Sequence, residues 1–93
     1  MRFEVYGKTD CAKCKSTKDK LAHLLGEAGG APNAAIAFVD MDTVEGLAEA
    51  AFQDVHDVPT TILRSDAGAL LARWDGKLPP TTEVHAFLAA GQA

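Results

Sequence analysis

The fold of this chain is indicated most clearly by residues 2–25, RFEVYGKTDCAKCKSTKDKLAHLL. The segment opens with alternating apolar and polar strand formers, which predicts a strand over residues 2–6. A short polar turn follows. Leucines then recur at helical spacing, which predicts a helix to about Leu25 whose first turn contains Cys11 and Cys14.

This first helix has a predicted start, a predicted buried face and a predicted end. Thr9 or Asp10 can cap its first turn, because both side chains accept hydrogen bonds from unpaired helical N–H groups. The buried face consists of Thr17, Leu21, Leu24 and Leu25. The residues predicted to end the helix and form a loop are Gly26, Gly29, Gly30 and Pro32.

A second strand and a second helix are predicted downstream. Residues 35–40 are apolar on both faces, as is typical of a strand covered by helices. Asp42 and Glu45 have the spacing of a capping box at the start of the helix, which Gly46 weakens modestly. The apolar residues at helical spacing are Val44, Leu47, Ala48, Ala51 and Phe52. Phe38, Phe52 and Phe87 are predicted to be core residues.

The last part of the chain predicts a hairpin and a helix. Residues 60–64 and 69–74 form two strands joined by a four-residue turn, and hence an antiparallel pair. A final helix begins after Pro79 and Pro80, and it buries Val84, Phe87 and Leu88. The order βαβαββα predicts one α/β domain over residues 1–93, with a four-stranded mixed sheet flanked by three helices.

Composition limits the possible functions. A chain of 93 residues with 47% hydrophobic and 24% charged residues is typical of one globular domain. A net charge of −4 argues against a nucleic-acid binder, and no apolar run approaches the roughly 20 residues of a membrane span. We expect a cytoplasmic location, because no signal peptide is visible. Two cysteines are too few for a disulfide framework or a structural zinc site.

The cysteine pair is the chemical centre of the sequence. Cysteines three residues apart in a first helical turn lie on one face, close enough to form a disulfide. Unpaired N–H groups and the helix dipole stabilise a thiolate there. The positive charges nearby are Lys8, Lys13, Lys15, Lys18 and Lys20. We therefore expect a depressed pKa for Cys11, the more exposed nucleophile, and a shielded, resolving Cys14.

Other interpretations of the pair remain open. The two cysteines could be unrelated reduced residues, one of them buried as a small apolar side chain. A soft-metal module is a further alternative, because two thiolates suit Cu(I). Copper-carrying domains with Cys-x-x-Cys after their first strand have the order βαββαβ, which differs from the order predicted here.

Val58-Pro59-Thr60, just before the third predicted strand, adds a second motif. Together with the cysteine pair it resembles the thioredoxin superfamily, and the resemblance covers nearly the whole chain. Residues 51–60 look like the thioredoxin stretch that leads into its cis-proline. The positions of Gly68 and Gly76 resemble those of thioredoxin turn glycines.

The front of the chain, residues 5–11, is more similar to glutaredoxins, which also carry a lysine three residues before the first cysteine, here Lys8. The dipeptide between the cysteines, Ala12-Lys13, matches neither group. The glutathione-binding double glycine of glutaredoxins is reduced to Asp75-Gly76. The buried aspartate of thioredoxins is replaced by Val5.

The resemblance implies a thiol–disulfide oxidoreductase, or electron carrier, of glutaredoxin size. The catalytic residues would be Cys11, Cys14 and a cis Pro59 that faces the cysteines. Substrate would meet Lys8, Lys13, Val58 and Thr60. No bound cofactor or metal is expected beyond the redox-active Cys11–Cys14 disulfide. The expected partners are a disulfide-containing protein and either an external reductase or glutathione, with the chain acting as a monomer.

Several polar residues receive separate predictions. Glu4 should face away from the cysteines, because strand side chains alternate. We expect it to be solvated or paired with lysine, and the alternative is a proton acceptor for the cysteines. The direction of the Asp57 side chain stays open. Trp74 is predicted to be a packing residue. The scattered histidines, of which His56 is nearest the cysteines, predict no metal site.

Overall fold

The computed structural model describes residues 1–27 and 35–92 and confirms the predicted order of elements. The elements are β1 (Arg2–Gly7), α1 (Ala12–Glu27), β2 (Ile36–Asp40), α3 (Val44–Phe52), β3 (Thr60–Arg64), β4 (Leu70–Asp75) and α4 (Thr81–Gln92). Most boundaries lie within one or two residues of those expected from the sequence. The predictions for Gly29, Gly30 and Pro32 fall outside the described residues.

The four strands form one mixed sheet in the order β2-β1-β3-β4. Strand β1 pairs in parallel with β2 and antiparallel with β3, where Val5 lies opposite Thr61. Strands β3 and β4 form the predicted antiparallel hairpin. Because β1 and β2 are parallel, the turns that follow Gly7 and Asp40 leave the sheet at the same end.

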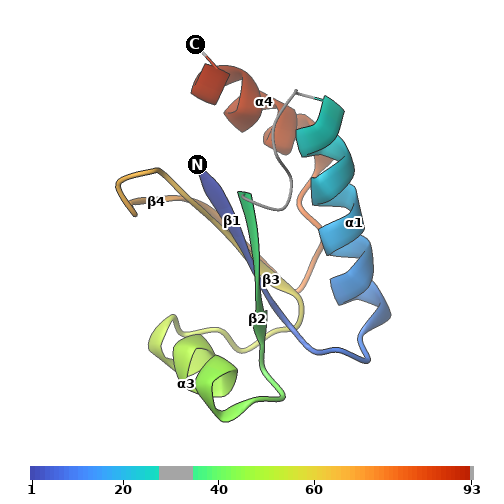
Figure 1. Ribbon diagram of the computed structural model, residues 1–93, viewed down its shortest axis with the longest axis vertical. Helices are drawn as coiled ribbons and strands as arrows, with labels where there is room; N and C mark the ends of the chain where they lie inside the picture. Colours follow the sequence, from blue (N-terminus) through green and yellow to red (C-terminus); the bar gives the residue numbers. More distant parts are fainter. Residues whose placement is uncertain (28–34, 93) are drawn as a thin grey trace.

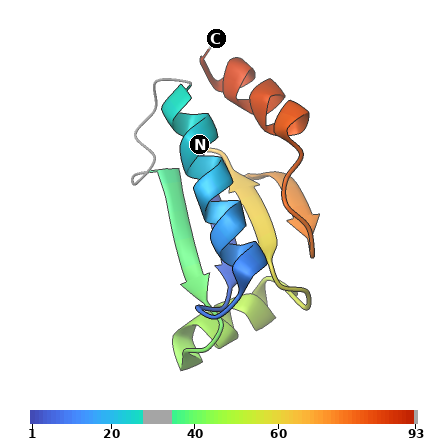
Figure 2. The same cartoon turned by 90° about the vertical axis from the view of Figure 1, so that its right-hand side faces the viewer.

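Helices lie on both faces of the sheet (Figures 1 and 2). Helices α1 and α4 cover one face, where Phe3, Val5 and Leu63 join the helical leucines in the larger core cluster. Helix α3 lies at the other face and contributes Ala50 to a smaller cluster with Tyr6 and Ile62. Strand alternation thus sends Val5 towards α1 and Tyr6 towards α3.

The buried face of α1 agrees with the prediction, since Thr17, Leu21, Leu24 and Leu25 are all buried. Gly26, however, lies inside the helix and does not end it. Strand β2 also differs from the prediction. It is an edge strand, so its side chains are half-buried where full burial was expected.

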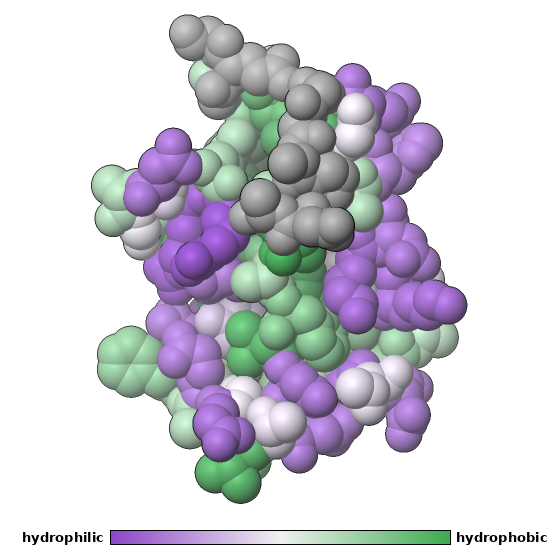
Figure 3. Space-filling model, in the orientation of Figure 1, coloured by the Kyte–Doolittle hydropathy of each residue, from purple (hydrophilic) through white to green (hydrophobic). Residues whose placement is uncertain are grey.

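The packing face predicted for α3 is wrong. Its buried residues are Gly46 and Ala50, whereas Val44 and Phe52 are 82% and 83% exposed. Leu47, Ala48 and Ala51 are exposed as well. Apolar side chains therefore gather on the surface over α3 (Figure 3). The apolar stripe of the helix is clear in the sequence, but it faces outward. The close approach of α3 to the Asp40 carbonyl, which leaves no room for a side chain at Gly46, turns the small residues inward instead.

The predicted cap of α3 is also wrong by one residue. Thr43, not Asp42, directly precedes the helix, and its Oγ1 accepts a hydrogen bond from Gly46 N at 3.0 Å. The Thr43 hydroxyl in turn donates to Asp40 O at 2.7 Å. The turn leaving β2 thus places Thr43 at the start of the helix, and Glu45 takes no part in the cap.

Candidate functional site

The two cysteines lie at the start of α1 and form a disulfide, with their Cα atoms 5.2 Å apart. Cys11 directly precedes the helix, and its Sγ accepts a hydrogen bond from Cys14 N at 3.1 Å. This is the bond that a capping side chain makes, so Cys11 itself occupies the place predicted for Thr9 or Asp10. As expected, Cys11 is half-exposed and Cys14 is only 1% exposed.

Gly7, at the end of β1, makes room for the resolving cysteine. A Cβ atom built on Gly7 would lie 2.5 Å from Cys14 Sγ and 3.3 Å from a ring carbon of Phe38. The Cys14 sulfur therefore occupies the space that a side chain at position 7 would fill. The sequence offered one signal for this contact, a glycine four residues before the first cysteine, and its role depends on how α1 sits on the sheet.

The loop before β3 reaches the same end of the sheet. The Val58–Pro59 peptide bond is cis, which confirms the prediction, and Pro59 is buried. Continuing the β1–β3 register beyond Tyr6 and Thr60 places Pro59 beside Gly7, and hence on the cysteine side. Pro59 O accepts a hydrogen bond from Gly76 N at 2.8 Å, which ties this loop to the turn after β4.

The other residues predicted to meet substrate surround this centre in different ways. Lys8 and Lys13 are exposed, on the turn before α1 and in its first turn. Val58 is half-buried. Thr60 is fully buried in β3 between Tyr6 of β1 and Asp75 of β4, and its hydroxyl donates to Asp57 O at 2.7 Å, so its side chain faces no substrate. The Asp57 side chain lies beside Gly76.

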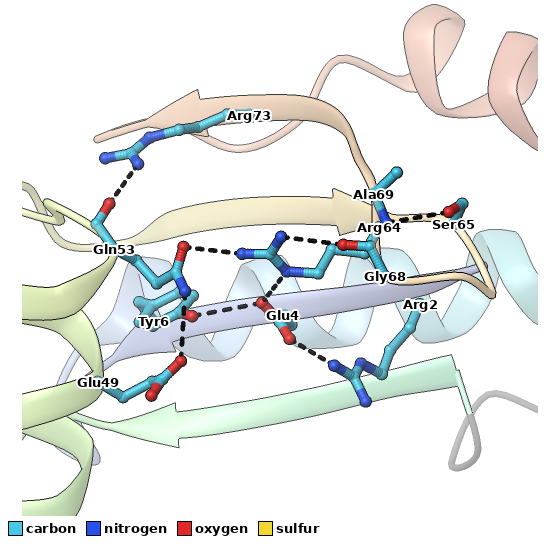
Figure 4. A network of polar contacts seen from close by, with 10 residues as sticks. All are labelled: Arg2, Glu4, Tyr6, Glu49, Gln53, Arg64, Ser65, Gly68, Ala69 and Arg73. Carbon is cyan, nitrogen blue, oxygen red and sulfur yellow. Dashed lines mark hydrogen bonds and ion pairs between the residues drawn. The ribbon is translucent and has the colours of Figure 1, made fainter.

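Glu4 belongs to a polar network on the opposite, α3-facing side of the sheet (Figure 4). It accepts hydrogen bonds from Arg64 Nε at 3.0 Å and from an Arg2 nitrogen at 2.7 Å, so its partners are arginines and not lysines. Arg64 also donates to Gln53 Oε1 at 2.8 Å. Glu4 therefore stabilises the sheet through its arginine partners. It lies on the face away from the cysteines, as the alternation of strand side chains predicted.

The network shifts two acid–base equilibria. Burial by itself would raise the pKa of Glu4, but hydrogen bonds from Arg64 and Arg2 outweigh it and hold that pKa below 4.5. Burial and the Glu4 carboxylate raise the pKa of Tyr6 to about 12. Sequence reasoning missed this network, because Arg64 lies 60 residues from Glu4.

We expect Glu4→Gln to lower the free energy of unfolding at pH 7 by about 1–3 kcal/mol, since it breaks charge-assisted hydrogen bonds in a half-buried place. A depressed folded pKa contributes stability above the unfolded value near 4.5, and that stability is lost as pH falls through the folded pKa. Denaturant titrations from pH 7 to 3 should show the two proteins converging in acid. A constant difference across this range would contradict the assignment.

The remaining candidates stay outside the site. Trp74 is buried, packs edge-on against Phe87 at 6.2 Å and donates to Glu83 Oε1, which confirms a packing role. His56 is exposed and pairs with Asp54 at 2.7 Å. Within residues 1–27 and 35–92, no three His, Cys, Asp or Glu side chains are grouped as metal ligands. None of the helices in the described part of the chain is long and apolar enough to cross a bilayer.

Comparison with known proteins agrees with this geometry. No protein-family model and no curated protein sequence matches the chain. Among solved structures it is similar to thioredoxin 1 of Thermosipho africanus TCF52B, at 20% identity over 100% of both chains with a TM-score of 0.71. Mitochondrial thioredoxin 3 of Saccharomyces cerevisiae, in its oxidized form, matches at 22% identity over 95% of this chain and 76% of its own, with a TM-score of 0.67.

A third similar structure is the glutaredoxin-like protein NrdH-redoxin of Escherichia coli, described as having a thioredoxin-like activity profile. It shares 23% identity over 91% of this chain and 96% of its own, with a TM-score of 0.54. These likenesses span nearly the whole chain and include the order of strands and helices. The chain therefore has the thioredoxin fold, with a Cys11–Cys14 disulfide at the start of its first helix.

Proposed function

We propose that this protein is a thiol–disulfide oxidoreductase that carries electrons by cycling Cys11 and Cys14 between disulfide and dithiol. The placement of Cys11 carries the proposal. Cys11 is half-exposed at the N-terminus of α1, and its sulfur accepts a hydrogen bond from Cys14 N and is bonded to the sulfur of that buried second cysteine. A helix N-terminus and a donated N–H both stabilise a thiolate, which is the form that attacks disulfides.

The reaction follows from this arrangement in two exchanges. The Cys11 thiolate attacks one sulfur of a substrate disulfide, so that a mixed disulfide forms and the other substrate sulfur leaves as a thiolate. Cys14 then loses its proton to solvent and attacks Cys11 Sγ. This second step forms the Cys11–Cys14 bond and releases the second substrate thiolate. Two electrons pass to the substrate, and an external dithiol reductase or glutathione must return them.

Substrate is proposed to approach over the end of the sheet where Gly7 and Pro59 lie. The backbone of Val58 would pair with an extended substrate segment, and Thr60 would hold the loop before Pro59 in place through its hydrogen bond to Asp57 O. Lys8 and Lys13 are exposed on the same side and would favour acidic partners through charge complementarity. We propose that the protein acts on disulfides of other proteins and works as a monomer.

Mass spectrometry of the protein equilibrated in a series of glutathione redox buffers tests this proposal. Loss of two hydrogens with little glutathione adduct is the expected result, since Cys14 is close enough to displace glutathione from Cys11. The midpoint would give the reduction potential. A dominant glutathione adduct would indicate glutaredoxin chemistry instead. Cysteines that stay reduced in fully oxidised buffer would overturn the redox function and lead to metal titrations.

A further inference from the structure

Thr61, the second residue of β3, has a buried hydroxyl without a hydrogen-bond partner. Its side chain is 0% exposed, and among the residues that the structure describes its Oγ1 is the one buried side-chain N or O atom that makes no hydrogen bond. Thr17 and Thr60, equally buried, both donate to backbone carbonyls. An unpaired buried hydroxyl is unfavourable, so it calls for an explanation.

The sheet register places Thr61 on the face of the sheet that the resolving cysteine covers. Thr61 lies opposite Val5, and side chains alternate, so Thr61 shares a face with Val5 and Gly7. The Cys14 sulfur occupies the side-chain space of Gly7. Gly7 is the diagonal neighbour of Thr61 across the β1–β3 pair, and diagonal Cβ positions lie about 7–8 Å apart. A hydroxyl and a sulfur that extend from these positions can meet directly or through one water molecule.

We infer that the Thr61 hydroxyl is a positioning group for Cys14, to which it donates a hydrogen bond once the disulfide is open. In the disulfide the Cys14 sulfur is bonded to Cys11, and the hydroxyl is unpaired. After reduction the sulfur is a thiol or thiolate and can accept the bond. The inference rests on the proposed function and concerns its second step, in which the Cys14 thiolate attacks Cys11 Sγ, the new S–S bond forms and the substrate thiolate leaves.

Three charged groups lie around this face, and none of them is hydrogen-bonded to the Thr61 hydroxyl. Lys18 of α1 lies 4.2 Å from the Phe38 ring centroid, and Phe38 is the β2 neighbour of Val5. From α4, Glu83 is bonded to Trp74, the β4 neighbour of Thr61. Asp57 lies in the loop before Pro59. Replacing Thr61 leaves all of these charges in place, so a change in the pH dependence of Cys14 attack would be due to the loss of the hydroxyl.

Thr61→Val removes the hydroxyl and keeps the shape of the side chain, whereas Thr61→Ser keeps the hydroxyl. We expect the Val variant to shift the pH midpoint of Cys14 attack upward by about one unit, the effect of losing a hydrogen bond to a charged group. At pH 7 the step should slow about threefold, because a more basic thiolate is scarcer but also more nucleophilic. Thr61→Ser should retain the wild-type midpoint.

The redox equilibrium gives a second measurement. The lost bond stabilises the Cys14 thiolate of the dithiol form. In glutathione buffers above the pH midpoint of Cys14, Thr61→Val should therefore favour the disulfide about tenfold more, a shift of about 30 mV to more negative potential. Denaturant unfolding should show the oxidised Val variant at least as stable as the oxidised wild type, since the unpaired hydroxyl is gone. The reduced variant should be less stable than the reduced wild type.

The outcomes separate this inference from the proposed function. If the wild type exchanges disulfides and Thr61→Val has the same pH midpoint and the same reduction potential, the role of Thr61 is overturned and the proposed function stands. Equal shifts in Thr61→Val and Thr61→Ser would assign the effect to lost packing and would overturn that role too. A wild type whose cysteines never exchange would overturn both proposals.

Discussion

Replacing Cys11 with serine is expected to abolish disulfide reduction. A serine hydroxyl stays protonated near neutral pH and cannot form a disulfide, so no mixed disulfide arises. We expect turnover in an insulin-reduction assay to fall roughly a thousandfold or more, which corresponds to a barrier higher by at least about 4 kcal/mol. The fold should persist, because Cys11 is half-exposed at the edge of the structure. Near-normal turnover in this variant would contradict the mechanism.

Cys14→Ser is the matched control for this assignment. It keeps the Cys11 nucleophile but removes the group that resolves the mixed disulfide, so the reaction should stop halfway. Mass spectrometry should detect substrate covalently attached to Cys11 that a strong reductant releases. Attachment to Cys14 in the Cys11 variant, with none at Cys11 in the Cys14 variant, would reverse the two roles.

Gly46→Ala is expected to destabilise the protein by about 3 kcal/mol or more, although alanine is the better helix former by about 1 kcal/mol. A Cβ on Gly46 would overlap the Asp40 carbonyl oxygen and lie 2.9 Å from Thr43 Oγ1. The backbone of the β2–α3 turn cannot withdraw without breaking the Thr43 cap. Chemical denaturation of oxidised protein would measure the loss.

Gly26→Ala provides the control for this substitution. Gly26 lies in α1, and no atom of residues 1–27 and 35–92 would come within 4 Å of an added Cβ. The same change should therefore raise the free energy of unfolding by about 0.5–1 kcal/mol, as helix propensity predicts. A stabilising effect at both glycines would show that α3 does not pack closely against the turn after β2.

The fold was largely predictable because its signals are local. The alternation in residues 2–6, the leucine spacing of α1 and the short turn of the hairpin each depend on neighbours in the sequence. The α3 face was not predictable in this way. Its apolar stripe predicted the wrong side, because the burial of Gly46 and Ala50 depends on the backbone at the end of β2, where the Asp40 carbonyl leaves no room for a larger residue.

The candidate site likewise has residues that the sequence predicts and residues that only the tertiary structure identifies. Cys11, Cys14 and Pro59 could be proposed from motifs, because their spacing and their places before a helix and a strand are visible in the sequence. The roles of Gly7 and Thr61 could not, since each depends on which side chain lies across the sheet or over it. The Glu4–Arg64 pair likewise requires the β1–β3 register.

The sequence by itself thus determined the order of strands and helices and the location of the redox pair, because short-range periodicity and helix-start chemistry are properties of neighbouring residues. The tertiary structure decided what surrounds that pair. It placed the Cys14 sulfur in the side-chain space of Gly7 and put the unpaired Thr61 hydroxyl diagonal to it. These contacts depend on the register of the strands and on how closely α1 packs on the sheet, which local sequence preference does not determine.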